Sequence, residues 1–177
     1  MQQVADLDPS SGSQPVSEST FADLLKPLIE PGFRLALAML HDAQAAEDAV
    51  QEASFTAWRK LGRMQDQGRL RPWFLGVVAN KCRNLRRKSW TRVALGVPKE
   101  LSVGSSEERM LRGSDLRKAI AQLKHDDRLV VVLYFYLDMP LEDVASVSGS
   151  SVGAARARLY RAINKLRPGV AIEEELR

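Results

Sequence analysis

The chain has 177 residues, enough for one medium-sized domain or two small ones, and its apolar content is ordinary for a globular protein. No apolar run approaches the roughly 20 residues that a membrane-spanning helix needs, and the N-terminus lacks the pattern of a signal peptide, so we expect a cytoplasmic protein without direct membrane insertion. The single cysteine, Cys82, excludes an internal disulfide and fits a reducing compartment. The net charge is only +4 and the pI about 9.4, so where the charges lie matters more than their total.

The first third of the chain predicts a polar tail followed by helices. Residues 1–20 are rich in Ser, Gln, Asp and Pro and lack apolar periodicity, which predicts a disordered tail. Helix is expected from Phe21, but Pro27 and the Pro31-Gly32 pair predict interruptions. We therefore expect a broken first helix, followed by a cleaner one over Phe33 to Leu40.

A second helix is predicted over Ala45 to Leu61, with two different faces. One stripe is apolar: Ala46, Val50, Ala53, Ala57 and Leu61. The opposite side is acidic and holds one aromatic: Glu47, Asp48, Gln51, Glu52 and Phe55. From these residues alone, two interpretations are equally good. Phe55 is either the exposed centre of a protein-docking surface or part of the core beside plain solubilising charges.

The segment after a polar loop at Gly62 to Leu70 is basic. No acid occurs from Gly68 to Lys99. Pro72 suits a helix start, and four-four-three spacing predicts a buried face of Phe74, Val78, Cys82 and Leu85. The other sides carry an aromatic and polar or basic groups: Trp73, Asn80, Arg83, Asn84 and Arg87. Trp73 can stack on unpaired bases or pack in the core beside Phe74. Cys82 is predicted to be inert packing, with a redox role as the alternative.

Residues 90–105 have no sustained period and are predicted to form an interdomain linker. Helix is expected to resume after Ser105-Ser106 and to extend through Gly113 to Leu123, with Leu116, Ile120 and Leu123 facing inward. Pro168-Gly169 should stop the last helix, before a short acidic tail.

Three short helices are predicted between Asp126 and Arg167. The first covers about Arg128 to Leu137, Pro140 opens the second, and the Ser148-Gly149-Ser150 turn leads into the third. This arrangement is a helix-turn-helix. The third helix has an apolar stripe of Val152, Ala155, Leu159, Ile163 and Leu166, and basic residues elsewhere: Arg156, Arg158, Arg161 and Lys165. Such a helix can enter a DNA major groove, or it can simply expose a solvated basic face.

No strand alternation is visible, so the predicted fold is all-α, with two small helical domains joined by a flexible linker. The predicted divisions are a tail (1–20), a first domain (21–89), a linker (90–105), a helix-turn-helix domain (106–168) and an acidic tail (169–177).

The segments AAEDAVQEASFTAWRKL (45–61), RPWFLGVVANKCRNLRRK (71–88) and Asp126 to Arg167, in this order and spacing, resemble the alternative sigma factors of bacterial RNA polymerase. The nearest group is the extracytoplasmic-function (group IV) one of the sigma-seventy family, which keeps only regions two and four. The resemblance covers nearly everything from Phe21 to Arg167. It implies three partners: core RNA polymerase, promoter DNA and an anti-sigma protein.

The resemblance also implies site residues. The acidic helix resembles the surface that docks on the polymerase clamp helices, through Asp48, Gln51, Glu52 and Phe55. Region two melts the minus-ten promoter element, with Trp73, Asn80 and Arg83 at the bases and Arg86, Arg87 and Lys88 at phosphates. The preceding loop, about Gln65 to Gly68, is expected to hold a flipped base. Region four reads the minus-thirty-five element, through Ser151, Gly153, Arg156, Arg158 and Arg161; the alanines at 154, 155 and 157 depart from the family pattern and put the promoter sequence in doubt.

Two other functions compete. A helix-turn-helix regulator acting without polymerase leaves the acidic helix and the Trp73 segment unexplained and usually needs a dimer. An enzyme is disfavoured, because His41 and His125 are isolated, expected at the surface, and no nucleophile, metal-ligand or phosphate-loop pattern occurs. We therefore expect no catalytic residues, no metal, no cofactor and no small-molecule substrate.

Overall fold

The computed structural model describes residues 18–61, 67–94 and 115–166. These residues contain helices and turns but no strand, which confirms the all-α prediction. Most of the predicted tail, the predicted linker beyond residue 94, residues 62–66 of the predicted polar loop and the predicted acidic tail lie outside the described ranges.

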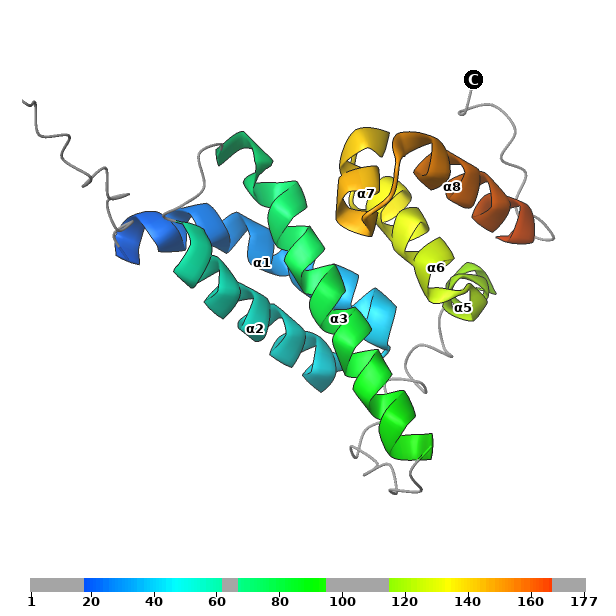
Figure 1. Ribbon diagram of the computed structural model, residues 1–177, viewed down its shortest axis with the longest axis horizontal. Coiled ribbons are helices and arrows are strands. Elements are labelled where there is room, and N and C mark those ends of the chain that lie inside the picture. The colour runs from blue at the N-terminus through cyan, green and yellow to red at the C-terminus, as the bar shows by residue number, and fades with distance from the viewer. Residues whose placement is uncertain (1–17, 62–66, 95–114, 167–177) are drawn as a thin grey trace, which may run out of the picture.

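Two helical units follow one another along the chain (Figure 1). The first unit contains α1 (Glu18–Leu40), α2 (Ala43–Leu61), the short 3-10 helix η1 (Gln67–Arg69) and α3 (Leu70–Ala94). The second contains α5 (Asp115–Gln122), α6 (His125–Val131), the π-helical turn η2 (Val132–Tyr136), α7 (Leu141–Ser148) and α8 (Val152–Leu166). Helix α3 extends through Ala94, beyond the linker start predicted at residue 90.

The prediction of a broken first helix is wrong, because α1 is continuous through Pro27 and Pro31. A proline inside a helix removes one backbone hydrogen bond and costs about 3 kcal/mol. Burial of Leu25, Leu28 and Leu35 against the neighbouring helices offsets that cost. Gly32 has a packing role rather than a breaking one, since a Cβ there would lie 3.0 Å from the Phe74 ring.

The first unit packs small residues of α2 against large ones of α1 and α3. The alanines predicted to face inward are fully buried, which lets the three helices approach closely. On α3 the predicted face is buried at Phe74, Val78 and Cys82, and half-buried at Leu85. Period-based prediction of these two stripes is therefore confirmed, apart from Leu85 and the side chain of Leu61, which lies outside the described part.

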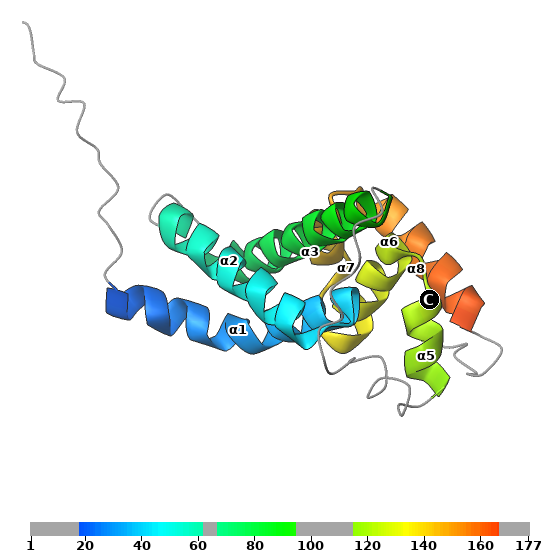
Figure 2. The same cartoon turned by 90° about the horizontal axis from the view of Figure 1, so that it is seen from below.

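The second unit is the predicted helix-turn-helix. Gly149 ends α7 in the left-handed conformation (φ 66°), and the Ser151 hydroxyl accepts a hydrogen bond from the Ala154 N–H at 3.2 Å, at the start of α8. Ala155, Leu159 and Ile163 are buried as predicted. Leu116 was predicted to face inward but is 44% exposed, whereas Ile120 packs against the core and Leu123 is buried. The short α5 lies at the end of the unit (Figure 2).

The two units pack against each other, with α7 beside α3 in both views (Figures 1 and 2). The Arg71 guanidinium of α3 donates to the Leu137 carbonyl at 2.5 Å. The buried Arg128 of α6 donates to the Ala38 carbonyl of α1 at 3.4 Å and contacts the His41 ring. The same guanidinium donates to the Leu123 carbonyl of its own unit at 3.1 Å, so Arg128 joins the end of α1 to the second unit.

Candidate nucleic-acid and protein interfaces

The exposed face of α2 combines acids with large apolar side chains. Asp48, Gln51 and Glu52 are exposed, and Phe55 is 61% exposed with the Arg59 guanidinium 4.8 Å from its ring centre. The interpretation that Phe55 belongs to the core is therefore wrong. An apolar ring of this size held at the surface among carboxylates is a feature of protein-contact surfaces.

Trp58 enlarges this face and was not predicted as part of it. It is 42% exposed and makes an edge-to-face contact with Phe21, with ring centres 4.9 Å apart. Its position three residues after Phe55 could have revealed it, because residues three apart on a helix are neighbours. Glu52 is tied to α3 through a 3.0 Å ion pair with Lys81, which fixes the acidic face relative to the basic helix.

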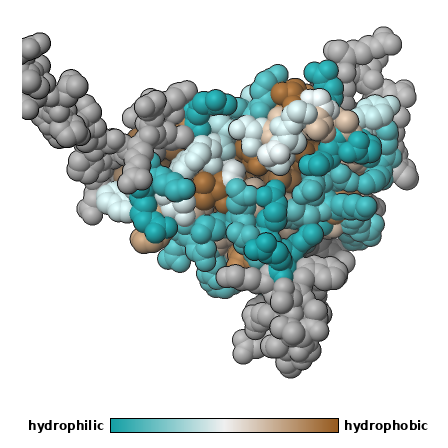
Figure 3. All heavy atoms as spheres, viewed as in Figure 1, coloured by the Kyte–Doolittle hydropathy of each residue, from teal (hydrophilic) through white to brown (hydrophobic). Residues whose placement is uncertain are grey.

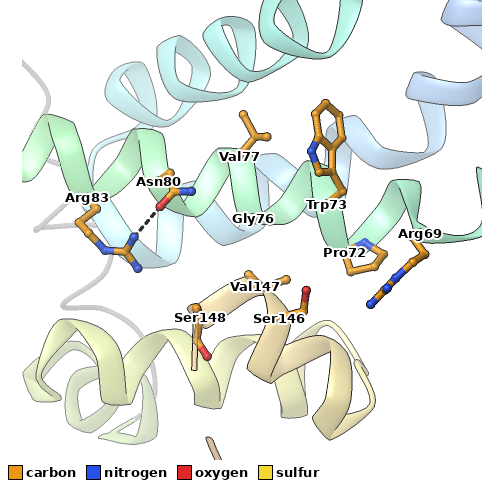
Figure 4. A pocket seen from close by; sticks show the side chains of 11 residues that line it. Arg69, Pro72, Trp73, Gly76, Val77, Asn80, Arg83, Ser146, Val147 and Ser148 are labelled. Carbon is orange, nitrogen blue, oxygen red and sulfur yellow. Dashed lines mark hydrogen bonds between the residues drawn. The ribbon is translucent and has the colours of Figure 1, made fainter. Parts of the chain in front are cut away.

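Three predicted residues of α3, Trp73, Asn80 and Arg83, line one open pocket (Figure 4). The Arg83 guanidinium donates to the Asn80 amide oxygen at 2.5 Å. Trp73 is half-buried and packs on the core while also lining the pocket, so neither the purely buried nor the purely exposed interpretation describes it.

The opposite wall of this pocket comes from the second unit. Residues 146–149, at the end of α7 and in its turn, face α3 across a space of about 480 Å³. The pocket therefore lies between the predicted base-contacting side chains and the helix-turn-helix. In this arrangement α7 covers part of the α3 surface that the sequence assigned to DNA.

Of the phosphate-contacting residues predicted further along α3, Arg86 reaches a second cavity. Arg86 and Arg87 are exposed, and Lys88 lies in α3 with its side chain outside the described part. Arg83 and Arg86 line one wall of the second cavity, and Arg158 and Arg161 of α8 line another. The structure thus brings together two groups of basic residues that the sequence assigned to different DNA elements.

The residues predicted to contact the upstream promoter element lie at the start and along the exposed side of α8. Ser151, Gly153, Arg156 and Arg161 are exposed, and Arg158 is half-buried. A Cβ added at Gly153 would meet nothing within 4 Å, so packing within the chain does not require glycine there. Tyr160, which the sequence did not single out, is 56% exposed on the same helix. Figure 3 shows mainly hydrophilic side chains around a central hydrophobic region on the face viewed in Figure 1.

Two buried titratable groups have shifted pKa values. Burial raises the pKa of the Cys82 thiol to about 12, which fits the predicted packing role. Burial, together with the charge of Arg86, lowers the pKa of His125 to about 4. His125 was expected at the surface but is only 7% exposed. The reason is that α6 begins where the two units meet, in the wall of the second cavity.

Within the described ranges, no group of three or more metal-ligating side chains occurs, and no helix there is long and apolar enough to cross a membrane. The described part of the chain presents an acidic face with exposed aromatic side chains on α2 and basic faces on α3 and α8.

Comparisons with known proteins match two separate stretches of the chain, one in each helical unit. Residues 25–92 match the family model of Sigma-70 region 2, and residues 114–166 match that of Sigma-70 region 4. The RNA polymerase sigma factor CarQ of Myxococcus xanthus is 30% identical over 135 residues, which cover 73% of this chain and 76% of CarQ. The probable RNA polymerase sigma factor RfaY of Xanthomonas campestris is also 30% identical, but the chain spans only 34% of that protein.

Two solved structures share the fold. The sigma factor RpoE in complex with the anti-sigma factor NepR, from Bartonella quintana, superposes with a TM-score of 0.70 at 26% identity, covering 84% of this chain and 94% of that one. CnrH in complex with the cytosolic domain of CnrY superposes with a TM-score of 0.65 at 22% identity, over 88% of this chain and 90% of CnrH. Both matches span the two helical units together.

Proposed function

The chain belongs to the sigma-70 family, as an alternative RNA polymerase sigma factor of the extracytoplasmic-function type, and on this premise we propose how its surfaces divide the work of promoter-specific initiation. The acidic face of α2 binds core RNA polymerase, α3 opens the minus-ten element, and α8 reads the minus-thirty-five element. The chemistry of RNA synthesis belongs to the polymerase, and the chain works beside it in the cytoplasm.

The polymerase-binding surface comprises Asp48, Gln51, Glu52 and Phe55. The single observation that supports it best is the exposed Phe55 ring, held by Arg59 on a face that is otherwise acidic. An aromatic anchor surrounded by charges has the composition of a binding hot spot and its rim. Trp58, one turn further on, extends the apolar centre of this surface.

The minus-ten surface comprises Trp73, Asn80, Arg83, Arg86, Arg87 and Lys88. Trp73, Asn80 and Arg83 lie close enough on α3 to line one pocket, so a single unpaired strand can meet all three once α7 has moved away. An aromatic face stacks on a captured base while the guanidinium groups follow the phosphates. The exposed Arg86 and Arg87 extend the basic side of α3 beyond that pocket.

The minus-thirty-five surface comprises Ser151, Gly153, Arg156, Arg158 and Arg161. The Ser151 hydroxyl caps the N-terminus of α8, so the contribution of Ser151 is to fix the start of that helix. The open space over Gly153 allows a DNA backbone to approach the first turn closely. Arg156, exposed one turn later, is placed to reach base edges.

The packing of α7 on α3 has a consequence for promoter binding. Two basic surfaces that face one cavity cannot both lie on a DNA duplex, so we propose that the two units separate when the factor engages a promoter. An anti-sigma protein is a further proposed partner, since the similar sigma factor RpoE was solved in complex with the anti-sigma factor NepR.

Reconstitution with core polymerase tests the proposal. Co-elution with the core enzyme in gel filtration, together with run-off transcripts that start at a defined promoter, is the expected result. A stable dimer that binds DNA alone and ignores the polymerase would instead identify a simple helix-turn-helix regulator.

A further inference from the structure

The second cavity between the two units has a volume of about 820 Å³ and is built from both of them. Its walls come from α3 on one side and from α6, α8 and the turn before α6 on the other. The lining residues are Arg83, Arg86, Leu123, Lys124, His125, Asp126, Asp127, Arg158, Arg161 and Lys165. A volume of this order is typical of small-molecule sites, which range over about 300–1,000 Å³.

Positive charge in this cavity exceeds negative charge. Lys165 is neutralised by Asp127, with Nζ and a carboxylate oxygen 2.6 Å apart. Arg86, Arg158 and Arg161 form no ion pair with any residue of the described ranges. Arg86 belongs to the first unit, and Arg158 and Arg161 belong to the second. Repulsion between these charges therefore opposes the packing of the two units unless an anion lies between them.

His125 supplies a second, independent observation. Its side chain is more than nine-tenths buried and lines the cavity, yet neither Nδ1 nor Nε2 has a hydrogen-bond partner in the described part of the chain. A buried polar nitrogen without a partner is costly and uncommon. The neutral imidazole, whose pKa lies near 4, still carries one N–H that can donate to an anionic oxygen in the cavity.

We propose that this cavity binds the triphosphate group of a small molecule, which bridges Arg86 of the first unit to Arg158 and Arg161 of the second and holds the factor closed. A triphosphate carries several negative charges close together. It can therefore pair at once with the three guanidinium groups that form no ion pair within the described ranges. Its tetrahedral oxygens suit guanidinium forks, and the His125 N–H completes the donor set. The ligand is regulatory: it occupies basic residues that promoter DNA needs.

Calorimetric titration of the full chain with sodium tripolyphosphate, at fixed ionic strength, tests the site. We expect saturable binding with one ligand per chain. Arg86→Gln and Arg158→Gln, which remove one cation from each wall, should each weaken binding by about tenfold or more. Lys26→Gln and Lys60→Gln remove exposed charges remote from the cavity and are the matched controls. Equal weakening by the controls, or the absence of saturation, would overturn the proposal.

Nuclear magnetic resonance gives a readout of the cavity itself, because the chain has only two histidines, His41 and His125. Tripolyphosphate should shift the His125 ring signals and raise the pKa of His125, since a nearby anion favours the imidazolium form. His125→Gln identifies that signal by its loss. A His125 signal that stays unmoved while the ligand binds would place the ligand elsewhere and reject the site.

Two further ligands identify the source of the phosphate group. Tighter binding of ATP than of tripolyphosphate assigns the cavity to a nucleotide, and equal or weaker binding of ATP assigns it to an inorganic phosphate chain. Binding of a polyglutamate peptide in the absence of any binding by the two phosphates would refute the proposal, because the cavity would then recognise an acidic protein segment.

Discussion

Phe55 is the residue in which the two interpretations of the acidic helix differed. Its side chain is 61% exposed, so it adds little to the core of the first unit, and its remaining role is at a surface. Helical spacing put Phe55 on the acidic side of the helix, opposite the apolar stripe, so its exposure was one of the two alternatives that the sequence left open. Packing of the three helices decided between them.

Phe55→Ala should weaken the binding of core RNA polymerase by about 1–3 kcal/mol, the range of a truncated aromatic anchor. The free energy of unfolding should change by less than about 0.5 kcal/mol, because the ring is exposed. Lys60→Ala, on the last turn of the same helix, is the control. Unchanged affinity in a fluorescence titration with core polymerase would show that the face does not dock.

Arg156 is exposed on the second turn of α8. Arg156→Ala should weaken binding to the upstream promoter element by about 1–3 kcal/mol if the guanidinium meets a base edge. Asn164→Ala, exposed near the other end of α8, should leave that binding intact. A footprint of the Arg156 variant identical to that of the wild type would mean that the guanidinium is only solvated.

His125 makes stability depend on pH. Its pKa is about 4 in the folded chain against 6.5 for the free side chain, because burial and Arg86, Arg83 and Arg128 disfavour the imidazolium and only Asp126 favours it. The unfolded chain therefore binds more protons between these values, and stability falls as the pH falls from about 6.5 to about 4, by at most about 3 kcal/mol.

Chemical denaturation at a series of pH values measures this effect. The difference in unfolding free energy between pH 7 and pH 5 should shrink in His125→Gln, which cannot take up the proton. His41→Gln is a comparison that keeps His125 in place. If both variants retained the wild-type slope, the carboxylates rather than His125 would account for it.

At the scale of the element, the helix-turn-helix depends on one backbone conformation. Gly149 has a φ of 66° and open space around its Cα, so the requirement for glycine there is conformational and not steric. The sequence predicted this turn because glycine between two helices is the usual way to end the first. The exposed Gly153, four residues later, has no such requirement.

Gly149→Ala should lower the free energy of unfolding by about 1 kcal/mol, the cost of a left-handed conformation for an L-residue. Gly153→Ala should instead leave stability unchanged or raise it by up to about 1 kcal/mol, since alanine is the better helix former. Thermal melts of the two variants measure the contrast. Equal melting temperatures would contradict the conformational role of Gly149.

The prediction of helix breaks and inward-facing side chains failed where tertiary contacts outweighed the conformational preferences of single residues. Pro27 and Pro31 indicated breaks, and locally they do remove two hydrogen bonds from α1. The helix nevertheless continues, because Leu25, Leu28 and Leu35 bury their side chains only if it does. Leu116 illustrates the reverse case: its helical spacing predicted an inward side chain, but no element of the described ranges covers it.

At the scale of the whole molecule, the contact between α3 and α7 sets which surfaces are accessible. Gly76 lies at this contact, where an added Cβ would stand 3.9 Å from the Val147 Cα. A methyl group fits there, whereas a larger side chain must displace α7. The contact therefore offers a way to separate the units without altering the core of either.

Gly76→Phe should open the packing and increase the radius of gyration measured by small-angle X-ray scattering, with unchanged helix content in circular dichroism. Gly76→Ala should retain the compact radius, because its methyl group makes only an ordinary contact. A compact Gly76→Phe variant would argue that the units do not depend on this contact.

The sequence by itself determined the helices, their buried stripes, the turn at Gly149 and the separation of acidic from basic faces. Each of these is a local property: side-chain spacing along a helix and the conformational freedom of single residues decide it. The order and spacing of three segments also indicated the family.

The tertiary structure alone decided that α1 crosses two prolines, that His125 is buried and that α3 faces α7 and α8 across shared cavities. These features depend on which surfaces of distant segments meet. Periodicity reports that a face is apolar or charged, but it does not report what covers that face. For this factor, that difference determines whether the basic surfaces face DNA or each other.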